Sequence, residues 1–426
     1  MPAGRDTPVA IDPAAVYGLA DLIDFAHRTN PATRHAWEQA RAAAAGTARA
    51  EAAYYPTLRL LVTGGTERDV FPSPMGSFMV EGPTVHPEAQ LAWILLDFGR
   101  RGSDVERNRD DLLAANFAFN RTLQEVAFAV SRSYFRLDAS RGRVTAARAT
   151  LQSAIAVEDA IRARRERGLA TRPELLLAEQ YHARAAFELE AALGGVADAQ
   201  AALAESLGIP PTALMRVADV SAVAVPTGLG DSVERIIDRA LRHRPDVAAR
   251  LAAVRAGEAA EQRAVAEFWP SLAFSGSAAQ AVQRYRAQPP SARFTTNDTE
   301  YKALFKLEWT MFDGLERENA VRQARSLRGA AAADLAGLEL QAVREVWQAY
   351  SDVKTALRKH DYARALLAAS QEAYESTLES YRSAGLATVL DLLTAQRDLA
   401  RARTTLIESR AELLTAFAAL TFAAGD

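Results

Sequence analysis

The sequence contains no cysteine and no long hydrophobic run. The absence of cysteine excludes disulfides, thiolate metal sites, cysteine nucleophiles and a lipid-modified N-terminal cysteine. No segment approaches the roughly 18 uninterrupted apolar residues of a transmembrane helix, so none is expected. Lysine and arginine number 50 against 53 aspartate and glutamate, and the net charge of −3 offers no basic surface for nucleic acid.

Residues that interrupt regular structure are also sparse. Only 17 proline and 23 glycine residues occur in a chain of 426 residues that is rich in alanine. This composition predicts a mostly helical protein with long helices. The six histidines are scattered, and no HExxH, GxGxxG or P-loop spacing occurs. The sequence therefore predicts neither catalysis nor a metal or cofactor.

The chain has the pattern of a duplication of one long unit. Pro31 and Pro56 are 25 residues apart, and so are Pro245 and Pro270, which gives an offset of 214 between the copies. Later segments keep nearly the same offset: Leu91-Ala-Trp93 with Asp97 against Leu307-Glu-Trp309 with Asp313, and Gly168-Leu-Ala-Thr171 against Gly385-Leu-Ala-Thr388. Motifs that recur in the same order at a nearly constant offset predict two structural repeats.

Each repeat is predicted to hold a leading helix, a β-hairpin, a long helix and a shorter return helix. The first repeat (1–213) has its hairpin at 57–97, long helix at 100–167 and return helix at 172–207; the second (214–426) has a short strand or linker at 214–231, a hairpin at 271–313, a long helix at 314–384 and a return helix at 388–424. A helix of this length measures about 100 Å at ~1.5 Å per residue. Leading and return helices together nearly equal the long one, which indicates end-to-end stacking beside it.

Strict alternation predicts the strands, and it is clearest over residues 300–311. One face carries Tyr301, Ala303, Phe305, Leu307, Trp309 and Met311, and the other carries Glu300, Lys302, Lys306, Glu308 and Thr310. We expect surface loops at about 67–87 and 284–298, where Pro, Gly, Ser and Asn gather. Strands of this length with one apolar face are typical of a membrane barrel. Because four strands cannot close one, three copies with twelve strands are favoured.

At this point the motifs resemble the TolC family of outer-membrane export ducts over about residues 17–424. The resemblance rests on Asn30-Pro31, Tyr55-Pro56, Leu91-x-Trp93-x-x-x-Asp97-Phe-Gly99, Leu307-x-Trp309-x-x-Phe-Asp313-Gly and Tyr381-x-x-x-Gly385-x-x-x-x-x-Asp391-x-x-x-Ala395-Gln396. It implies a mainly α protein with a β-barrel portion: a trimer with a twelve-stranded barrel in the outer membrane of a Gram-negative bacterium and a long α-helical barrel in the periplasm.

The resemblance also implies the function and the partners. The expected protein is the exit duct of a tripartite efflux pump or type I secretion system, bound to outer-membrane lipid, a periplasmic adaptor and an inner-membrane pump or ABC exporter. The first residues, MPAGRDTPVAIDPAAV, have no apolar signal-peptide core, so a trimmed chain or a misassigned start is expected. A soluble coiled-coil scaffold without a barrel is the alternative, and the alternation at 300–311 is the feature against it.

The turns after the long helices are predicted to form the periplasmic tips. Gly168 and Gly385 are expected to be C-capping glycines with positive φ. By the resemblance, the same turns meet the adaptor, and Leu169 and Leu386 are exposed apolar residues that suit docking.

The candidate aperture residues follow from the resemblance. Asp391 lies six residues past Gly385, where some family members place an aspartate that narrows the aperture; the next such position is Thr394 here, and Glu174 is the counterpart in the first repeat. Three copies of Asp391 would form a carboxylate ring that selects cations and raises its own pKa values. The alternative is a first-turn acid that is stabilised by the helix dipole.

Two tryptophans end the apolar strand faces just before the long helices. Trp93 and Trp309 are predicted to be aromatic residues at the membrane interface, or to pack at the join between strand and helix. Asp97 and Asp313 are expected to turn the chain into the helix.

Overall fold

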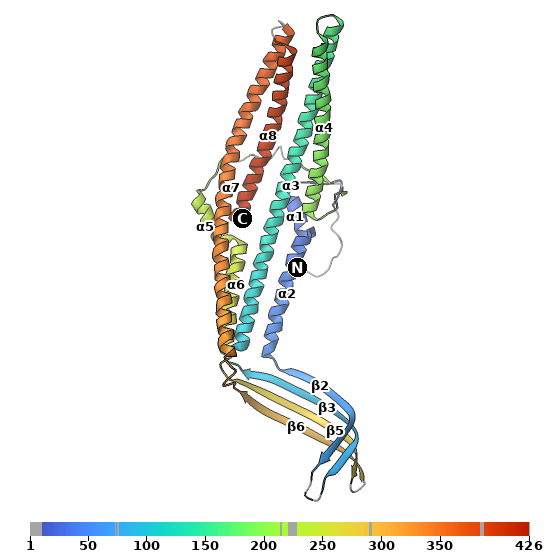
Figure 1. The fold of residues 1–426 in the computed structure, drawn as a ribbon, viewed down its shortest axis with the longest axis vertical. Coiled ribbons are helices and arrows are strands. Elements are labelled where there is room, and N and C mark those ends of the chain that lie inside the picture. The colour runs from blue at the N-terminus through green and yellow to red at the C-terminus, as the bar shows by residue number, and fades with distance from the viewer. Residues whose placement is uncertain are drawn as a thin grey trace. The chain divides into compact units, whose positions relative to one another are not determined.

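The computed structural model describes residues 11–72, 74, 76–213, 215–219, 228–288, 292–383 and 387–425. Helices and strands follow one another in the same order twice (Figure 1). The helices are α1 (Leu19–Thr29), α2 (Pro31–Glu51), α3 (Arg100–Glu166), α4 (Arg172–Leu207), α5 (Val233–His243), α6 (Pro245–Ala266), α7 (Glu316–Ser383) and α8 (Val389–Ala424). The strands are β1 (Val16–Tyr17), β2 (Thr57–Phe71), β3 (Phe78–Leu96), β4 (Arg216–Val217), β5 (Ser271–Gln288) and β6 (Ala292–Glu308).

Helix length follows the absence of proline. Helix α3 has 67 residues and α7 has 68, and neither contains proline. Helix α2 ends at Glu51, and a 3₁₀ turn at Ala52–Tyr54 follows it before Pro56. The mainly α fold with a β portion is confirmed.

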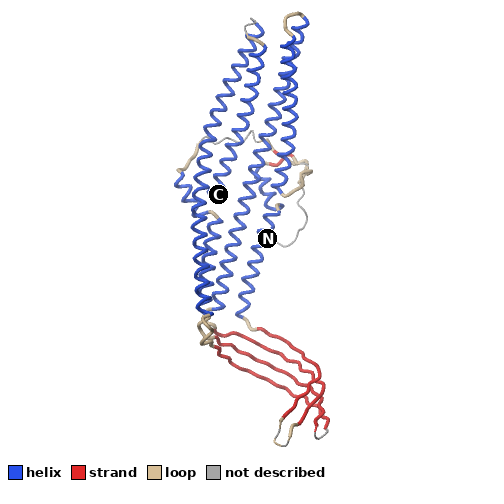
Figure 2. Tube along the Cα trace, viewed as in Figure 1, coloured by secondary structure: helices blue, strands red, loops and turns tan. Residues whose placement is uncertain are grey.

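The strands form one antiparallel sheet in the order β2-β3-β5-β6. Strands are drawn in red in Figure 2, and β1 and β4 form a separate parallel pair. The expected loops at 67–87 and 284–298 are wrong, because β2 runs to Phe71, β3 starts at Phe78, β5 runs to Gln288 and β6 starts at Ala292. Glycine, proline and asparagine indicated turns, but in this region they occupy ladder positions of long strands.

The prolines of β3 show how a strand tolerates them. Pro83 and Pro87 face Thr66 and Val62 of β2 in an unbroken register. On the other side, the described ladder with β5 passes from Glu81 directly to Thr84 and skips the positions around both prolines. A proline has no N–H to donate, so it weakens one ladder without shifting the register.

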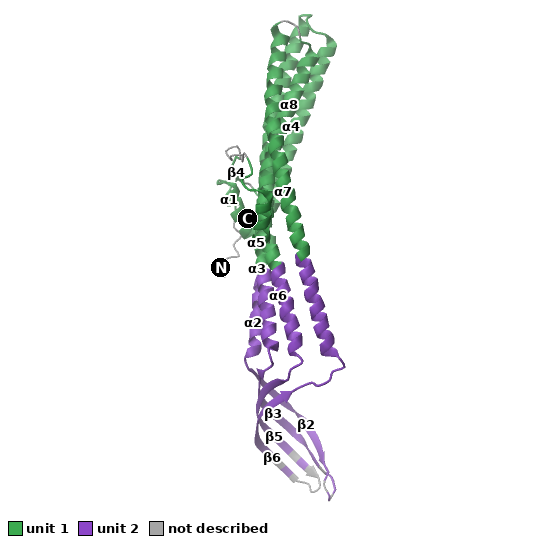
Figure 3. Ribbon diagram, turned by 90° about the vertical axis from the view of Figure 1, so that its left-hand side faces the viewer, with its two compact units in different colours: residues 1–39, 116–249, 336–426 green, residues 40–115, 250–335 purple. Residues whose placement is uncertain are grey.

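The described chain divides into two compact units, coloured separately in Figure 3. One unit comprises residues 40–115 and 250–335 and holds the four-stranded sheet with the adjoining helix segments. The other comprises residues 1–39, 116–249 and 336–426 and holds the remaining helices. Both units contain segments from each half of the sequence, so the compact units are not the two repeats.

The helical unit contains the stacked joints that the helix lengths predict. Helix α4 ends at Gly208, whose φ is +74°, and a Cβ there would lie 2.8 Å from Cα of Asn30. Helix α8 ends likewise at Gly425, which packs against Arg244. The end of each return helix therefore packs against the residue that precedes the first proline of a leading helix.

Buried side chains repeat between the two halves in the same way. Leu22 and Ala26 of α1 are buried in one cluster with α3 and α4. Ile236 and Ala240 of α5 are buried in a second cluster with α7 and α8. The offset is 214 for both pairs, which is the offset of the prolines. The duplication therefore extends from sequence to core packing.

Candidate functional site

The sheet has one apolar and one polar face. Directly paired residues share a face, and so do alternate residues along a strand. The apolar face carries Leu58, Leu60 and Val62 of β2, Val85, Ala89, Leu91 and Trp93 of β3, Leu272, Phe274, Ala278 and Val282 of β5, and Tyr301, Ala303, Phe305 and Leu307 of β6. The polar face carries Arg59 and Thr63, His86, Glu88 and Gln90, Ser275 and Ser277, and Glu300, Lys302, Lys306 and Glu308.

Most of the large apolar side chains on this face are exposed. Tyr301 is 85% exposed and Leu58 is 78% exposed. Exposed apolar surface of this extent is unfavourable in water and marks a surface that another phase or partner covers. The face is therefore built for contact with something other than water.

A compact polar joint connects β3 to α3. Asp97 Oδ2 accepts hydrogen bonds from the backbone N–H of Arg101 at 2.9 Å and from its Nε at 2.8 Å. The Arg101 guanidinium also donates to the carbonyl oxygen of Ile94 at 2.7 Å and lies over the Tyr54 ring. Trp93 Nε1 donates to the carbonyl oxygen of Tyr54 at 2.9 Å. Asp97 therefore caps the helix and holds the arginine that ties the strand to it.

The same joint occurs between β6 and α7. Asp313 accepts from the backbone N–H of Arg317 at 3.3 Å and from its Nε. The Arg317 guanidinium lies over the Phe268 ring, and Trp309 Nε1 donates to the Phe268 carbonyl oxygen at 3.1 Å. Both tryptophans thus pack at the join between strand and helix, although they stay partly exposed. Their assignment to the membrane interface stays a prediction.

At the first tip, Glu174 closes a capping box. Gly168 has a φ of +73° and ends the turn after α3. Thr171 precedes α4. Glu174 Oε2 accepts hydrogen bonds from the Thr171 backbone N–H at 2.6 Å and from the Thr171 hydroxyl at 2.9 Å. These two hydrogen bonds, the backbone one first, lower the pKa of the Glu174 carboxyl. Leu169 is 65% exposed in the turn.

Asp391 closes the equivalent box at the second tip. Its Oδ2 accepts from the Thr388 hydroxyl at 2.7 Å and from the Thr388 backbone N–H at 2.9 Å. The side-chain bond, then the backbone bond, lowers the pKa of Asp391. Thr394 is half-buried one turn further along α8. Gly385 and Leu386 lie outside the described residues.

The two boxes start helices that share one core. The residue after Glu174, Leu175, and the residue after Asp391, Leu392, are both buried in one cluster with Val157 and Ile161 of α3. The structure thus brings the two tip acids onto neighbouring helices. Each acid bonds its own threonine, and among the described residues no hydrogen bond connects Thr394 with Asp391. Their role at an aperture stays a prediction.

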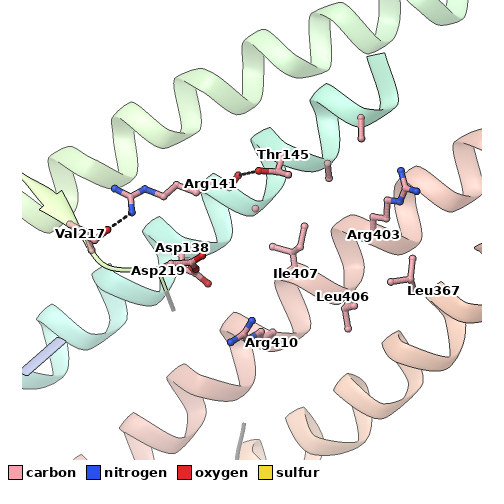
Figure 4. Close-up of a pocket in the computed structure, with 13 residues that line it drawn as sticks. Asp138, Arg141, Thr145, Val217, Asp219, Leu367, Arg403, Leu406, Ile407 and Arg410 are labelled. Atoms are coloured by element: carbon pink, nitrogen blue, oxygen red, sulfur yellow. Dashed lines mark hydrogen bonds between the residues drawn. The ribbon is translucent and has the colours of Figure 1, made fainter. Parts of the chain in front are cut away.

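Figure 4 shows a cavity of about 710 Å³ that is lined by α3, α7, α8 and the segment around β4. Arg141 of α3 donates to the carbonyl oxygen of Val217 at 3.0 Å. Asp138 and Asp219 lie beside this contact, and Arg403 and Arg410 approach from α8. The wall carries both signs of charge together with leucine and isoleucine side chains. The hydrogen bond between Arg141 and Val217 ties the short β1–β4 pair to α3.

The outer membrane efflux protein family model matches residues 22–209 and 236–426, which together are most of the chain. The chain belongs to the outer membrane efflux protein family. Among curated relatives, it is 30% identical over 422 residues to Protein CyaE of Bordetella pertussis, covering 96% of this chain and 84% of the relative. It is 26% identical over 392 residues to outer membrane protein OprJ of Pseudomonas aeruginosa, covering 89% and 78%.

Solved structures share the fold of this outer membrane efflux family protein. The outer-membrane channel OprN superposes with a TM-score of 0.82 at 20% identity, over 99% of this chain and 96% of that one. The chain is therefore an outer-membrane exit duct for efflux or type I secretion, not an enzyme, and these comparisons give no support to a soluble scaffold. None of the described helices is both long and apolar enough to cross a membrane.

Sequence reasoning missed Arg101 and Arg317, the central residues of the two joints. The signal was present, because each arginine follows its aspartate by four residues and the pair recurs at an offset of 216. This spacing was overlooked because an aspartate followed four residues later by an arginine is common on the surface of any helix. Only the tertiary contacts of these guanidinium groups with the preceding segment distinguish them.

Proposed function

We propose that three copies of this chain form one continuous export duct. The four-stranded sheet with one apolar face supports this proposal. Among the described strands, β2 pairs only with β3 and β6 pairs only with β5, so both edges of the sheet are unpaired. Unpaired edges are not tolerated in lipid, so β2 of one copy pairs with β6 of the next. Three copies give twelve strands, which leave an open lumen lined by the polar face.

The long helices form the periplasmic part of the duct in this proposal. The chain is proposed to consist of two repeats, residues 1–213 and 214–426, each of which contributes one long helix and one stacked pair to the helical wall. The stacked joints at Gly208 and Gly425 support this arrangement, because they make the short helices continuous. The aromatic residues Trp93 and Trp309 then lie where the strands leave the membrane.

The tips are proposed to bind a periplasmic adaptor that belongs to an inner-membrane pump or ABC exporter. Leu169 supports this role, since it is an exposed leucine held in a tight turn by the capping box next to it. Leu386, next to Gly385, is the corresponding residue of the second turn. The energy for export comes from the inner-membrane partner, because the chain has no nucleotide-binding motif.

The aperture is proposed to lie at the start of α8. Three Asp391 carboxylates would form a ring, with Thr394 one turn deeper and Glu174 on the neighbouring helix. In a single chain, Thr388 lowers the pKa of Asp391, so the acid enters the ring ionised at neutral pH. Ionised carboxylates that face a pore attract cations and repel anions.

Single-channel recording in a planar bilayer tests the duct and its aperture together. Wild-type protein is expected to open discrete, cation-preferring channels. Asp391→Ala is expected to raise the conductance and weaken the cation preference, because the charged constriction is lost.

Thr388→Ala is the matched control, since it removes the cap of α8 but keeps the carboxylate, and it is expected to retain the cation preference. Channels from Asp391→Ala with unchanged conductance and selectivity would refute the aperture assignment. The absence of any channel activity in the wild-type protein would refute the duct.

A further inference from the structure

The apolar face of the sheet passes through polar side chains, such as Gln280 of β5 and its partner Thr299 of β6, into arginines. On β5 this face runs from Leu272 to Val282, and the next two positions on the same face are Arg284 and Arg286. From Leu272 to Val282 the strand advances by ten residues, with Gln280 the one polar side chain on this face, which is about 34 Å along the strand and about 26 Å in height at a tilt of ~40°. This height is close to the roughly 25 Å of an outer-membrane apolar band. In a membrane barrel, Arg284 and Arg286 would therefore lie just beyond a stretch of about this height.

The neighbouring strands place further arginines at the same level. The register pairs Arg68 with Glu81, Glu81 with Arg286, and Arg286 with Arg293, so these four residues form one row across all four strands. No register shift occurs between this row and the apolar band, hence both lie on one face. We call Arg68, Arg284, Arg286 and Arg293 the basic rim.

The basic rim carries a charge that the described residues do not neutralise. Glu81 is the one acid in the row, and it lies 3.7 Å from Arg68. Four arginines and one glutamate leave a charge of +3. Arg284, Arg286 and Arg293 are exposed, and no ion pair to a carboxylate is found for them among the described residues. Like charges directly opposite each other destabilise a sheet, yet Arg286 faces Arg293.

The opposite face of the same strands is balanced instead. Lys306 pairs with Glu308 at 2.8 Å, and Lys302 follows Glu300 on the same face of β6. The excess of arginine is thus confined to the outward face, just past the apolar band. The hairpin end of the sheet is the end away from the adjoining helices, so in an outer-membrane duct this level is that of the outer leaflet.

We propose that the basic rim binds the phosphate groups of lipid A, the phosphorylated glycolipid of the outer leaflet. The guanidinium fork matches a phosphate in geometry and charge, and it keeps its charge at any physiological pH. Two opposed arginines on adjacent strands can share one phosphate, which removes their mutual repulsion. The proposal rests on the insertion of the sheet as a membrane barrel, and it goes further by naming a lipid and the residues that hold it.

Native mass spectrometry of the full-length protein in detergent tests the proposal with two probes, bisphosphorylated lipid A and the same lipid after removal of its phosphates. One arginine near an anionic lipid surface corresponds to about a fivefold change in affinity. The triple variant Arg284→Gln, Arg286→Gln and Arg293→Gln is therefore expected to bind lipid A about 100-fold more weakly than wild type. Wild type is expected to lose a similar factor with the dephosphorylated probe.

The matched control is the triple variant Arg59→Gln, Lys302→Gln and Lys306→Gln, which removes three charges from the opposite face of the same strands and is expected to keep lipid A binding. Equal binding of both probes to wild type would overturn the proposal without any variant. So would equal loss in both triple variants, or binding of phosphatidylglycerol as tight as that of lipid A. The mass of the complex in the same spectrum shows separately whether the oligomer formed.

Discussion

At the scale of the residue, burial rather than sequence context sets the protonation of His360. It lies on α7, and its Nδ1 is 3.2 Å from Oγ of the buried Ser409 on α8. Burial is the main cause that lowers its pKa below the ordinary 6.5, and the nearby Arg364 and Arg410 act in the same direction against Asp361. The folded protein therefore favours the neutral ring.

The pH dependence of stability follows from this shift. Because the folded pKa lies below the unfolded value, His360 binds a proton more readily in the unfolded chain, so stability is lost as the pH falls through 6.5 towards the folded pKa. His360→Gln keeps a polar partner for Ser409 but cannot take up the proton. We expect a smaller loss of unfolding midpoint between neutral and mildly acidic pH in this variant. An identical loss in both proteins would contradict the burial argument.

The tip acids show how far residue-scale reasoning from sequence reaches. A threonine followed three residues later by an acid is a capping box, and both Thr171–Glu174 and Thr388–Asp391 form one. The local role of these acids could therefore be predicted. Their second role at an aperture depends on symmetry-related copies, which no single chain contains.

At the scale of the element, the joints tie each strand to the helix that follows it. The Arg101 and Asp97 side chains are only 12% and 10% exposed. Asp97→Ala leaves a nearly buried guanidinium without its acid and uncaps α3, so we expect a loss of about 1–3 kcal/mol of stability. Thermal unfolding in detergent measures it.

The exposed pair Arg107 and Asp111 on the same helix provides the control. Their closest atoms are 3.8 Å apart, and both side chains are about half exposed. Asp111→Ala is therefore expected to change stability by less than about 0.5 kcal/mol. Equal midpoints for the two variants would show that the joint at Asp97 is not a stabilising element.

Helices were easier to predict from this sequence than strands, and the reason is physical. A helix satisfies its own backbone and needs only the absence of proline, as in α3 and α7. A strand is stabilised by its neighbours, so Pro83 and Pro87 were mistaken for a loop although their pairing with β2 holds them in a sheet. The basic rim was missed for the same reason, because only the register aligns its arginines.

At the scale of the whole molecule, one chain supplies a third of a closed structure in the proposed duct. The described sheet has two unpaired edge strands and a face of exposed apolar side chains. The apolar face is unfavourable in water, and the unpaired edges are not tolerated in lipid. Three copies resolve both, because the edges pair and the apolar face meets lipid.

The most direct test is the mass of the complex after detergent extraction from the outer-membrane fraction, combined with gel mobility before and after heating. A trimeric duct should give a complex of three protomers of 46.1 kDa each that needs detergent and changes mobility on heating. A monomer or dimer that extracts into buffer without detergent would contradict the trimeric duct.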